Sequence, residues 1–311
     1  MDTLAVVLEE PERIALSRLN LVSSGDEDIV VDVEWSGIST GTERLLWSGR
    51  MPPFPGMGYP LVPGYESVGR VAFAGSLSGR RAGERVFVPG ASCFGPVRGL
   101  FGGTASRLVV PGHRATPVGE ELEDRGVLLA LAGTAYHAIV VAERTPDLII
   151  GHGVLGRLLA RLTVALGGKP AVWEQNRDRI AGADGYVVTT ASDDERRDYK
   201  TIIDVSGDST ILDTLVSRLA PRGEIILAGF YPKPIEFTFP PAFMKEAKIR
   251  VSAEWQPSDL EHAKALIDSG ALSLNGLITH RRPALEAASA YRTAFEDPSC
   301  LKMVLDWRAC G

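Results

Sequence analysis

The chain has few cysteines and no excess of positive charge. Its 311 residues include only Cys93, Cys300 and Cys310, which stand far apart. Three scattered thiols cannot build a disulfide framework or a C-x-x-C metal site, so a cytoplasmic location is expected. Lysine and arginine number 33 against 39 acidic residues, a formal charge of −6. Because no basic cluster is interleaved with aromatics, nucleic acid is excluded as an expected partner.

A membrane-spanning run is also missing from the pattern. The most apolar stretch, 126–142, contains Thr134, Tyr136 and His137 and falls short of the ~20 apolar residues that cross a bilayer. No secretory signal is recognised at the first residues, and no amphipathic basic helix indicates attachment to a membrane surface. We therefore expect no integral membrane segment and interpret 126–142 as a buried helix between two domains.

What the chain does contain is a glycine-rich turn between an apolar run, 148–150, and leucines at helical spacing. The pattern G-x-G-x-x-G is formed by Gly151, His152, Gly153, Val154, Leu155 and Gly156. In this context it predicts a dinucleotide site. Gly151 permits the tight turn, Gly153 lets backbone N–H groups approach the pyrophosphate, and Gly156 allows close packing of helix on strand. The positive end of the helix then faces the phosphates, and His152 is expected only to contact the cofactor.

A carboxylate follows at the distance that a ribose-binding residue requires. The expected strand 171–174 ends in Glu174, about twenty residues after the glycines, where it can accept both ribose hydroxyls and would repel a 2′-phosphate. The cofactor expected is therefore NAD. Arg177 and Arg179 follow closely and could hold that phosphate, which leaves NADP open. The alternative is that Glu174 merely ends a strand and that both arginines are solvated.

The expected elements fall into two groups that differ in period. Short β-rich runs punctuated by glycine and proline predict a compact β-barrel; they are 5–8, 29–34, 67–73, 85–89 and 106–110. Strands alternating with helices then predict a doubly wound parallel sheet; they are 148–150, 171–174, 186–188, 201–205 and 224–228. A helix at 258–269, an extended 277–279, a helix at 284–294 and a strand at 301–306 should return to the first lobe.

A long irregular segment, 49–64, carries five prolines among apolar side chains. Ordered loops of this length are often functional, and Phe54, Met57 and Tyr59 could form the wall of a large flat ligand site. Phe94 and Phe101 are expected to contribute to the same wall. The alternative is a rigid surface connection stiffened by proline.

The order of these signals resembles the medium-chain dehydrogenase/reductase superfamily over essentially the whole chain. S-G-I-S-T-G-T-E at 36–43 is similar to its first active-site loop, P-G-Y-E at 63–66 to its P-G-H-E turn, and A-G-T-A-Y at 132–136 to the start of its interdomain helix. The resemblance implies an α/β protein with a GroES-like β-barrel catalytic domain, 1–131 and 254–311, and a Rossmann cofactor domain, 132–253. It also implies that Thr134, Ser206 and Gly229 contact the cofactor, and that the protein is a homodimer.

The zinc ligands of that superfamily are replaced here. Zinc alcohol dehydrogenases use a cysteine of the first loop, the histidine of P-G-H-E and a second cysteine before the interdomain helix. The corresponding residues are Ser39 or Thr40, Tyr65 and Leu131, which cannot supply the thiolates or imidazoles that zinc prefers. The stretch 91–103, where the cysteines of the structural zinc would lie, contains only Cys93. We predict a member without metal.

Longer strings resemble one subfamily, the bacteriochlorophyllide a dehydrogenases. They include W-S-G-I-S-T-G-T-E, L-W-S-G-R-M-P-P-F-P-G and I-G-H-G-V-L-G-R-L-L-A-R. This resemblance implies oxidation of the 3-(1-hydroxyethyl) group of a magnesium bacteriochlorin, 3-hydroxyethyl bacteriochlorophyllide a, to a 3-acetyl group in bacteriochlorophyll a biosynthesis, with NAD as acceptor. Two alternatives stay open: a zinc-free quinone or enoyl reductase that uses NADPH, and a non-catalytic dinucleotide-binding carrier of a tetrapyrrole pigment.

Without a metal, protein groups must take the hydroxyl proton and stabilise the developing alkoxide. Tyr65 is the expected acid/base, although a phenol with an ordinary pKa near 10 needs a cationic neighbour or a relay partner. Ser39, Thr40 and Thr42 are the expected relay hydroxyls. Glu66 could orient Tyr65 or take the proton through water.

Each of these roles has a structural alternative. Tyr65 could simply pack in the cleft, Glu66 could form a salt bridge with an arginine such as Arg70, and Thr134 could cap a helix. His137, on the expected interdomain helix, could donate to the alkoxide, relay a proton or ligate the magnesium of the chlorin. It could equally be a buried histidine with satisfied hydrogen bonds.

Overall fold

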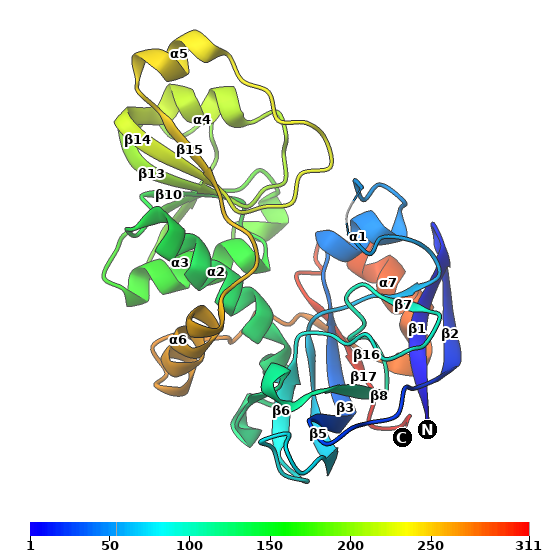
Figure 1. The fold of residues 1–311 in the computed structure, drawn as a ribbon. Coiled ribbons are helices and arrows are strands. Elements are labelled where there is room, and N and C mark those ends of the chain that lie inside the picture. The colour runs from blue at the N-terminus through cyan, green and yellow to red at the C-terminus, as the bar shows by residue number, and fades with distance from the viewer. Residues whose placement is uncertain (54, 311) are drawn as a thin grey trace. The chain divides into compact units, whose positions relative to one another are not determined.

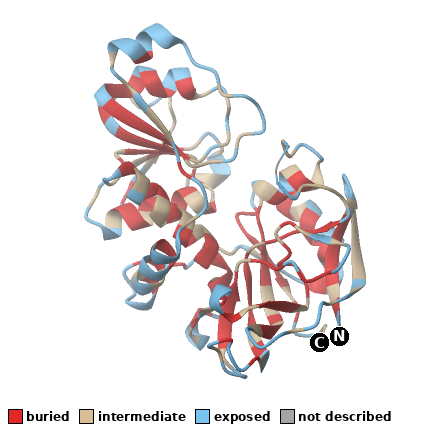
Figure 2. Ribbon diagram, in the orientation of Figure 1, coloured by how far each residue is buried: buried red, intermediate tan, exposed pale blue. Residues whose placement is uncertain are grey.

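The computed structural model describes residues 1–53 and 55–310, which divide into two compact units. The first unit comprises Met1–Ala130 and Leu277–Gly311, and the second comprises Leu131–Gly276. Each unit has its own sheets and helices (Figure 1). In each, the buried residues gather on the sheet strands (Figure 2).

The first unit is the expected β-barrel domain. Its larger sheet has the order β16 (His280–Pro283), β17 (Met303–Asp306), β3 (Asp28–Ile38), β5 (Ser67–Ala74), β6 (Arg85–Val88) and β9 (Thr116–Pro117), with β8 (Arg107–Pro111) also paired to β3. A smaller sheet has the order β2 (Arg13–Asn20), β1 (Asp2–Glu10), β4 (Leu61–Val62) and β7 (Arg98–Gly99). Valines and isoleucines of β3 enter a core shared with Leu108 and Met303. Two helices, α1 (Thr42–Trp47) and α7 (Ala287–Glu296), belong to this unit.

The second unit is a doubly wound parallel sheet. Its strands are β10 (Leu148–Ile150), β11 (Ala171–Trp173), β12 (Val187–Thr189), β13 (Tyr199–Asp204), β14 (Leu219–Leu227) and β15 (Lys248–Val251). They lie in the order β12-β11-β10-β13-β14-β15, all parallel. Strand order therefore reverses beside β10, and in such sheets ligands bind at the carboxyl ends of the strands where the order reverses. The helices of this unit are α3 (Val154–Ala165), α4 (Leu212–Arg218), α5 (Phe239–Met244), α6 (Pro257–Asp268) and most of α2 (Leu129–Ala142).

The boundary after the second unit differs from the prediction. The sequence placed the return to the barrel at residue 254, whereas residues up to Gly276 belong to the second unit. The reason is that α6 packs on α2: His137 Nδ1 lies 2.7 Å from Asp259 Oδ2, and Tyr136 stacks on His262 with ring centroids 5.4 Å apart. The later elements α7 and β17 complete the first unit as expected.

One helical stretch, Glu120–Ala142, is long and apolar enough to cross a membrane by length and composition alone. Of its most apolar window, 61% is buried inside the protein. Its first part is a 3₁₀ segment, Glu120–Leu128, in which Glu123 has a φ of 46° and breaks the helical path before α2. Core helices have the same composition, and we attribute the hydropathy of this stretch to its packing.

Candidate active site

The glycine loop lies at the carboxyl end of β10, between β11 and β13. Gly151 donates its N–H to the Trp173 carbonyl at 2.8 Å and has a φ of 100°, which glycine adopts without strain. A Cβ at Gly156 would lie 1.9 Å from the Gly151 oxygen, whereas one at Gly153 would meet nothing within 4 Å. Gly153 is the N-cap of the twelve-residue α3, with no side-chain cap. The first N–H groups of α3, at Val154 and Leu155, thus start a helix suited to bind a pyrophosphate.

Glu174 contacts this loop directly. Its Oε2 accepts the backbone N–H of His152 at 2.9 Å, and its Oε1 accepts that of Asn176 at 2.8 Å. The carboxylate is therefore held against the glycine loop, at the position that a ribose-binding carboxylate takes in dinucleotide-binding sheets of this kind. Arg177 is exposed and Arg179 half-buried in the segment that follows. The expected ribose ligand and the Arg179 carbonyl thus both contact His152 of the glycine loop, and Arg177 lies in the same segment as Arg179.

The side chain of His152 does not face the place of a cofactor. It is completely buried, with Nδ1 2.5 Å from the Arg179 carbonyl and Nε2 2.8 Å from the Tyr186 hydroxyl. Burial lowers the pKa of His152 to about 4, so the ring is neutral and donates through Nδ1 while Nε2 accepts from Tyr186. Arg157 of α3 donates to the His152 and Ala181 carbonyls. The predicted cofactor contact of His152 is thus restricted to its backbone.

Other expected cofactor residues lie at the same edge of the sheet. The Ser206 N–H donates to Asp204 Oδ1 at 2.9 Å after β13, and the Gly229 N–H donates to the Asp204 carbonyl at 3.0 Å after β14. A Cβ at Gly151 would lie 3.5 Å from Ser206 Cα, so these loops meet the glycine loop. Thr134 is the sixth residue of α2, which makes the helix-cap alternative wrong.

In the first unit, the structure brings two predicted hydroxyls together. Tyr65 Oη donates to Ser39 Oγ at 2.7 Å. The Tyr65 ring also meets Phe101 edge-on, with centroids 5.4 Å apart. Thr42 forms a further side-chain hydrogen bond to Tyr65. Thr40 is half-buried in the same loop, without such a contact among the described residues.

The electrostatic surroundings of Tyr65 are anionic. Burial first, and then the charges of Glu66 and Glu43, raise the pKa of Tyr65 above its ordinary value, while the Ser39 and Thr42 hydrogen bonds act in the opposite direction. The sequence argument required a cation near Tyr65, and the first unit does contain a buried one: Lys302 is 1% exposed. This ammonium group binds Glu66, however, and not Tyr65. The phenol therefore keeps its proton at neutral pH.

Glu66 is completely buried and holds that cation. Lys302 Nζ donates to its two carboxylate oxygens at 2.9 and 2.7 Å. Glu66 thus forms a salt bridge, as the structural alternative expected, but with a lysine. Arg70, the arginine suggested as its partner, instead pairs with Glu120 at 2.9 and 3.0 Å. Lys302 lies 236 residues away in the chain, and no local pattern marked it as the partner.

His137 of α2 has the contact expected of a satisfied histidine. Its Nδ1 lies 2.7 Å from Asp259 Oδ2, and the same oxygen accepts the Gln256 N–H at 2.8 Å at the start of α6. This bond ties α2 to α6 within the second unit. It favours the structural alternative over the three catalytic roles considered for His137.

The expected ligand wall is only partly available. Phe94 is 2% exposed and packs in the barrel core, so it cannot face a ligand. Met57, Tyr59 and Phe101 are half-buried against a cluster formed by Leu8, Leu46, Leu61 and Leu100. Phe54 lies outside the described residues. Among the residues described, no group of three or more His, Cys, Asp or Glu side chains could hold a metal ion.

Comparison with known proteins agrees with this arrangement. Residues 25–120 match the family model of the alcohol dehydrogenase GroES-like domain. The "short chain alcohol dehydrogenase" of Escherichia coli CFT073, solved with NADH, is similar in fold with a TM-score of 0.82 over 98% of this chain and 99% of that one, at 22% identity. The protein is thus an oxidoreductase of the alcohol dehydrogenase fold, with a site for a nicotinamide dinucleotide.

Two curated relatives are similar over the full length. The 2-desacetyl-2-hydroxyethyl bacteriochlorophyllide A dehydrogenase of Cereibacter sphaeroides is 58% identical, with 99% of each chain covered. The enzyme of the same name from Rhodobacter capsulatus is 57% identical, again over 99% of each chain. With this identity over its whole length, the chain belongs to the family of the 2-desacetyl-2-hydroxyethyl bacteriochlorophyllide A dehydrogenases, within the medium-chain dehydrogenase/reductase superfamily.

Proposed function

We propose that this protein oxidises the 3-(1-hydroxyethyl) group of 3-hydroxyethyl bacteriochlorophyllide a to a 3-acetyl group, with NAD as acceptor and without catalytic zinc. The relatives' names give the same ring position the number 2 of an older convention. The observation that carries the proposal is the 57–58% identity to them over 99% of the chain. The reaction belongs to bacteriochlorophyll a biosynthesis, in the cytoplasm.

NAD is favoured over NADP by the position of Glu174. Its carboxylate is held against the glycine loop by two backbone N–H groups, and a 2′-phosphate placed there would meet its negative charge. The bound cofactor supplies the hydride acceptor. The loop and the first turn of α3 bind its pyrophosphate, and Arg177, Thr134, Ser206 and Gly229 are its further proposed contacts.

The Tyr65–Ser39 pair is the proposed route for the hydroxyl proton. Because the raised pKa of Tyr65 keeps it protonated, it cannot act as a standing base. The substrate proton instead passes to Tyr65 Oη as the phenolic proton moves to Ser39 Oγ, along the hydrogen bond of 2.7 Å. The hydroxyl proton of Ser39 passes finally to water, with Thr40 and Thr42 as the proposed relay hydroxyls on the way. This shift balances charge without forming a lasting phenolate.

The residues at the former zinc positions fit this chemistry better than a metal. A serine hydroxyl and a phenol that hydrogen-bond each other at 2.7 Å are poor zinc ligands. Glu66 has both oxygens bound by Lys302, and we propose that it fixes the turn that carries Tyr65. Met57, Tyr59 and Phe101 remain the proposed apolar wall for the macrocycle, with Phe54 beside them in the sequence.

The test is turnover by purified, metal-analysed protein with 3-hydroxyethyl bacteriochlorophyllide a, following NADH and the pigment spectrum, with NADP in parallel. Acetyl product with NAD and substoichiometric zinc is expected. Tyr65→Phe should lose turnover, whereas the matched control Tyr199→Phe, which removes a phenol bound to Asp194, should keep it. Cofactor binding without turnover would favour the pigment carrier, and reduction of an activated double bond with NADPH would favour the quinone or enoyl reductase.

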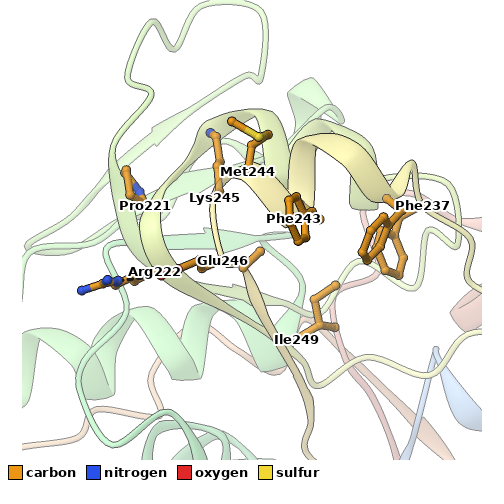
Figure 3. A pocket seen from close by; sticks show the side chains of 11 residues that line it. Pro221, Arg222, Phe237, Phe243, Met244, Lys245, Glu246 and Ile249 are labelled. Carbon is orange, nitrogen blue, oxygen red and sulfur yellow. Dashed lines mark hydrogen bonds and ion pairs between the residues drawn. The ribbon is translucent and has the colours of Figure 1, made fainter.

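We further propose a homodimer that forms through an apolar face of the second unit. Phe237, Phe243 and Met244 are 43%, 63% and 78% exposed and line a groove that reaches Ile249 of β15 (Figure 3). Strand β15 stands at the edge of its sheet, where unpaired N–H and C=O groups can pair with the strand of a second copy. Light scattering should give the mass of a dimer, and Phe243→Asp with Met244→Asp should give a monomer. A monomeric wild-type protein would contradict the proposal.

A further inference from the structure

A buried carboxylate lies behind the Tyr65–Ser39 pair. Glu43, in the first turn of α1, is 1% exposed. Its Oε1 accepts the Ser39 N–H at 2.9 Å, and its Oε2 accepts the Tyr291 hydroxyl at 2.6 Å. Ser39 therefore links the two groups: its hydroxyl accepts from Tyr65 and its amide donates to Glu43.

Near Glu43 lie a second buried carboxylate, Glu66, and one buried cation, Lys302. Glu66 and Lys302 are both buried, and the ammonium gives its hydrogen bonds to Glu66 and, at 3.3 Å, to the Ile38 carbonyl. With both carboxylates ionised, the cluster carries one net negative charge away from water. An uncompensated buried charge is costly, and a proton on Glu43 removes it.

The protonation of Glu43 follows from these neighbours. Burial raises the pKa of Glu43 from 4.5 to about 7, and the charge of Glu66 adds to the rise. The hydrogen bonds from Ser39 and Tyr291 and the charge of Lys302 act in the opposite direction. The groups that face Glu43 are Ser39 after β3, Tyr291 of α7, Tyr65 and Glu66 of the P-G-Y-E turn, and Lys302 before β17.

We propose that Glu43 is a positioning residue whose gain and loss of a proton sets the pH range in which the Tyr65–Ser39 pair supports oxidation. The inference rests on the proposed function. Protonated Glu43 leaves the region behind Tyr65 without net charge, which favours the negative charge that develops on the substrate oxygen. Ionised Glu43 opposes that charge. When Glu43 is protonated, Oε1 still accepts from Ser39, and Oε2 becomes a hydroxyl that donates to Tyr291.

Glu43→Gln reproduces the protonated form, because its amide oxygen can accept from Ser39 and its NH₂ group can donate to Tyr291. We expect kcat of the wild type to fall by up to about tenfold relative to Glu43→Gln as the pH rises from about 6 to about 9. Tyr291→Phe removes a bond that lowers the pKa of Glu43, so the inflection should move to higher pH with an unchanged KM for NAD. Parallel pH profiles for the wild type and Glu43→Gln would overturn the proposal.

A second measurement needs neither substrate nor turnover. Infrared titration of the wild type should show a protonated carboxyl C=O band that disappears as the pH rises through about 7. The band should be missing from Glu43→Gln. Its absence from the wild type would also overturn the proposal. A titrating band in a protein that shows no turnover with the pigment would instead count against the proposed function.

Discussion

Replacing Lys302 by methionine should destabilise the first unit strongly. The change leaves Glu66, which is completely buried, without the ammonium that contacts it at 2.7 and 2.9 Å. Breaking a buried ion pair from one side costs about 3–5 kcal/mol, because the remaining charge stays in a medium that solvates it poorly. We therefore expect Lys302→Met to lower the free energy of unfolding by this amount at pH ~8.

The double variant Lys302→Met/Glu66→Met tests the origin of that cost. Replacing both partners by apolar residues of similar size should restore the free energy of unfolding to within about 1 kcal/mol of the wild type. The exposed pair Arg222–Glu246, with side chains 79% and 66% exposed, is the matched control. Arg222→Met should cost less than about 1 kcal/mol.

Urea unfolding followed by tryptophan fluorescence measures these differences. Trp307 is 1% exposed in the same unit and donates to Ser36 at 2.8 Å, so its emission reports on this core. If Lys302→Met cost no more than Arg222→Met, or if the double variant were no better than the single one, the reasoning about the buried pair would be refuted.

Four further outcomes are expected. Tyr65→Phe should lower kcat about 100-fold with little change in KM, because it removes proton transfer and not binding; steady-state kinetics checks this. Glu174→Gln should raise KM for NAD about ten- to a hundredfold and narrow the preference over NADP, as measured by kcat/KM for each cofactor. Gly156→Ala should abolish NADH fluorescence enhancement, since its Cβ would lie 1.9 Å from the Gly151 oxygen. Because the pKa of Glu43 is raised to about 7, its protonation stabilises the folded state fully below pH 4.5, and this contribution is lost as the pH rises to about 7. The free energy of unfolding should therefore decrease by about 3 kcal/mol over this range, as measured by urea unfolding at several pH values. The decrease should be absent from Glu43→Gln.

Helices and strands whose apolar residues recur at a clear spacing could be predicted from the sequence. Those with few buried residues could not. The apolar runs of β10 and β13 and the glycine turn carry their own signal, because both faces of these strands are buried. Strand β2 was missed since most of its residues are half-buried or exposed, as an edge strand allows. The sequence predicts helix α6 but not its packing on α2. The prediction that α6 belongs to the first unit is therefore wrong.

The residues of the candidate site likewise divide into those that a local motif marks and those that no local motif marks. Ser39 and Tyr65 were singled out because each lies in a recognisable string, and the structure joins them by a hydrogen bond. Lys302 and Tyr291 were missed because their partners lie 236 and 248 residues away. Their contacts depend on α7 and β17 returning to the barrel. A local motif shows which residue types occur in one segment. The pairing of distant strands determines which of their side chains are in contact.

The histidine inside the glycine loop limits how the cofactor preference of this protein can be redesigned. The motif leaves its second position unspecified, yet His152 binds the Arg179 carbonyl and the Tyr186 hydroxyl below the loop. A change of the Tyr186 side chain, or one that moves the backbone at Arg179, therefore alters the support of the glycine turn as well as the surroundings of Glu174. A variant engineered to use NADP would have to preserve these two hydrogen bonds of His152. Libraries that vary residue 152 together with Arg177 and Arg179 should therefore yield more variants that fail to fold than variants with a changed cofactor preference.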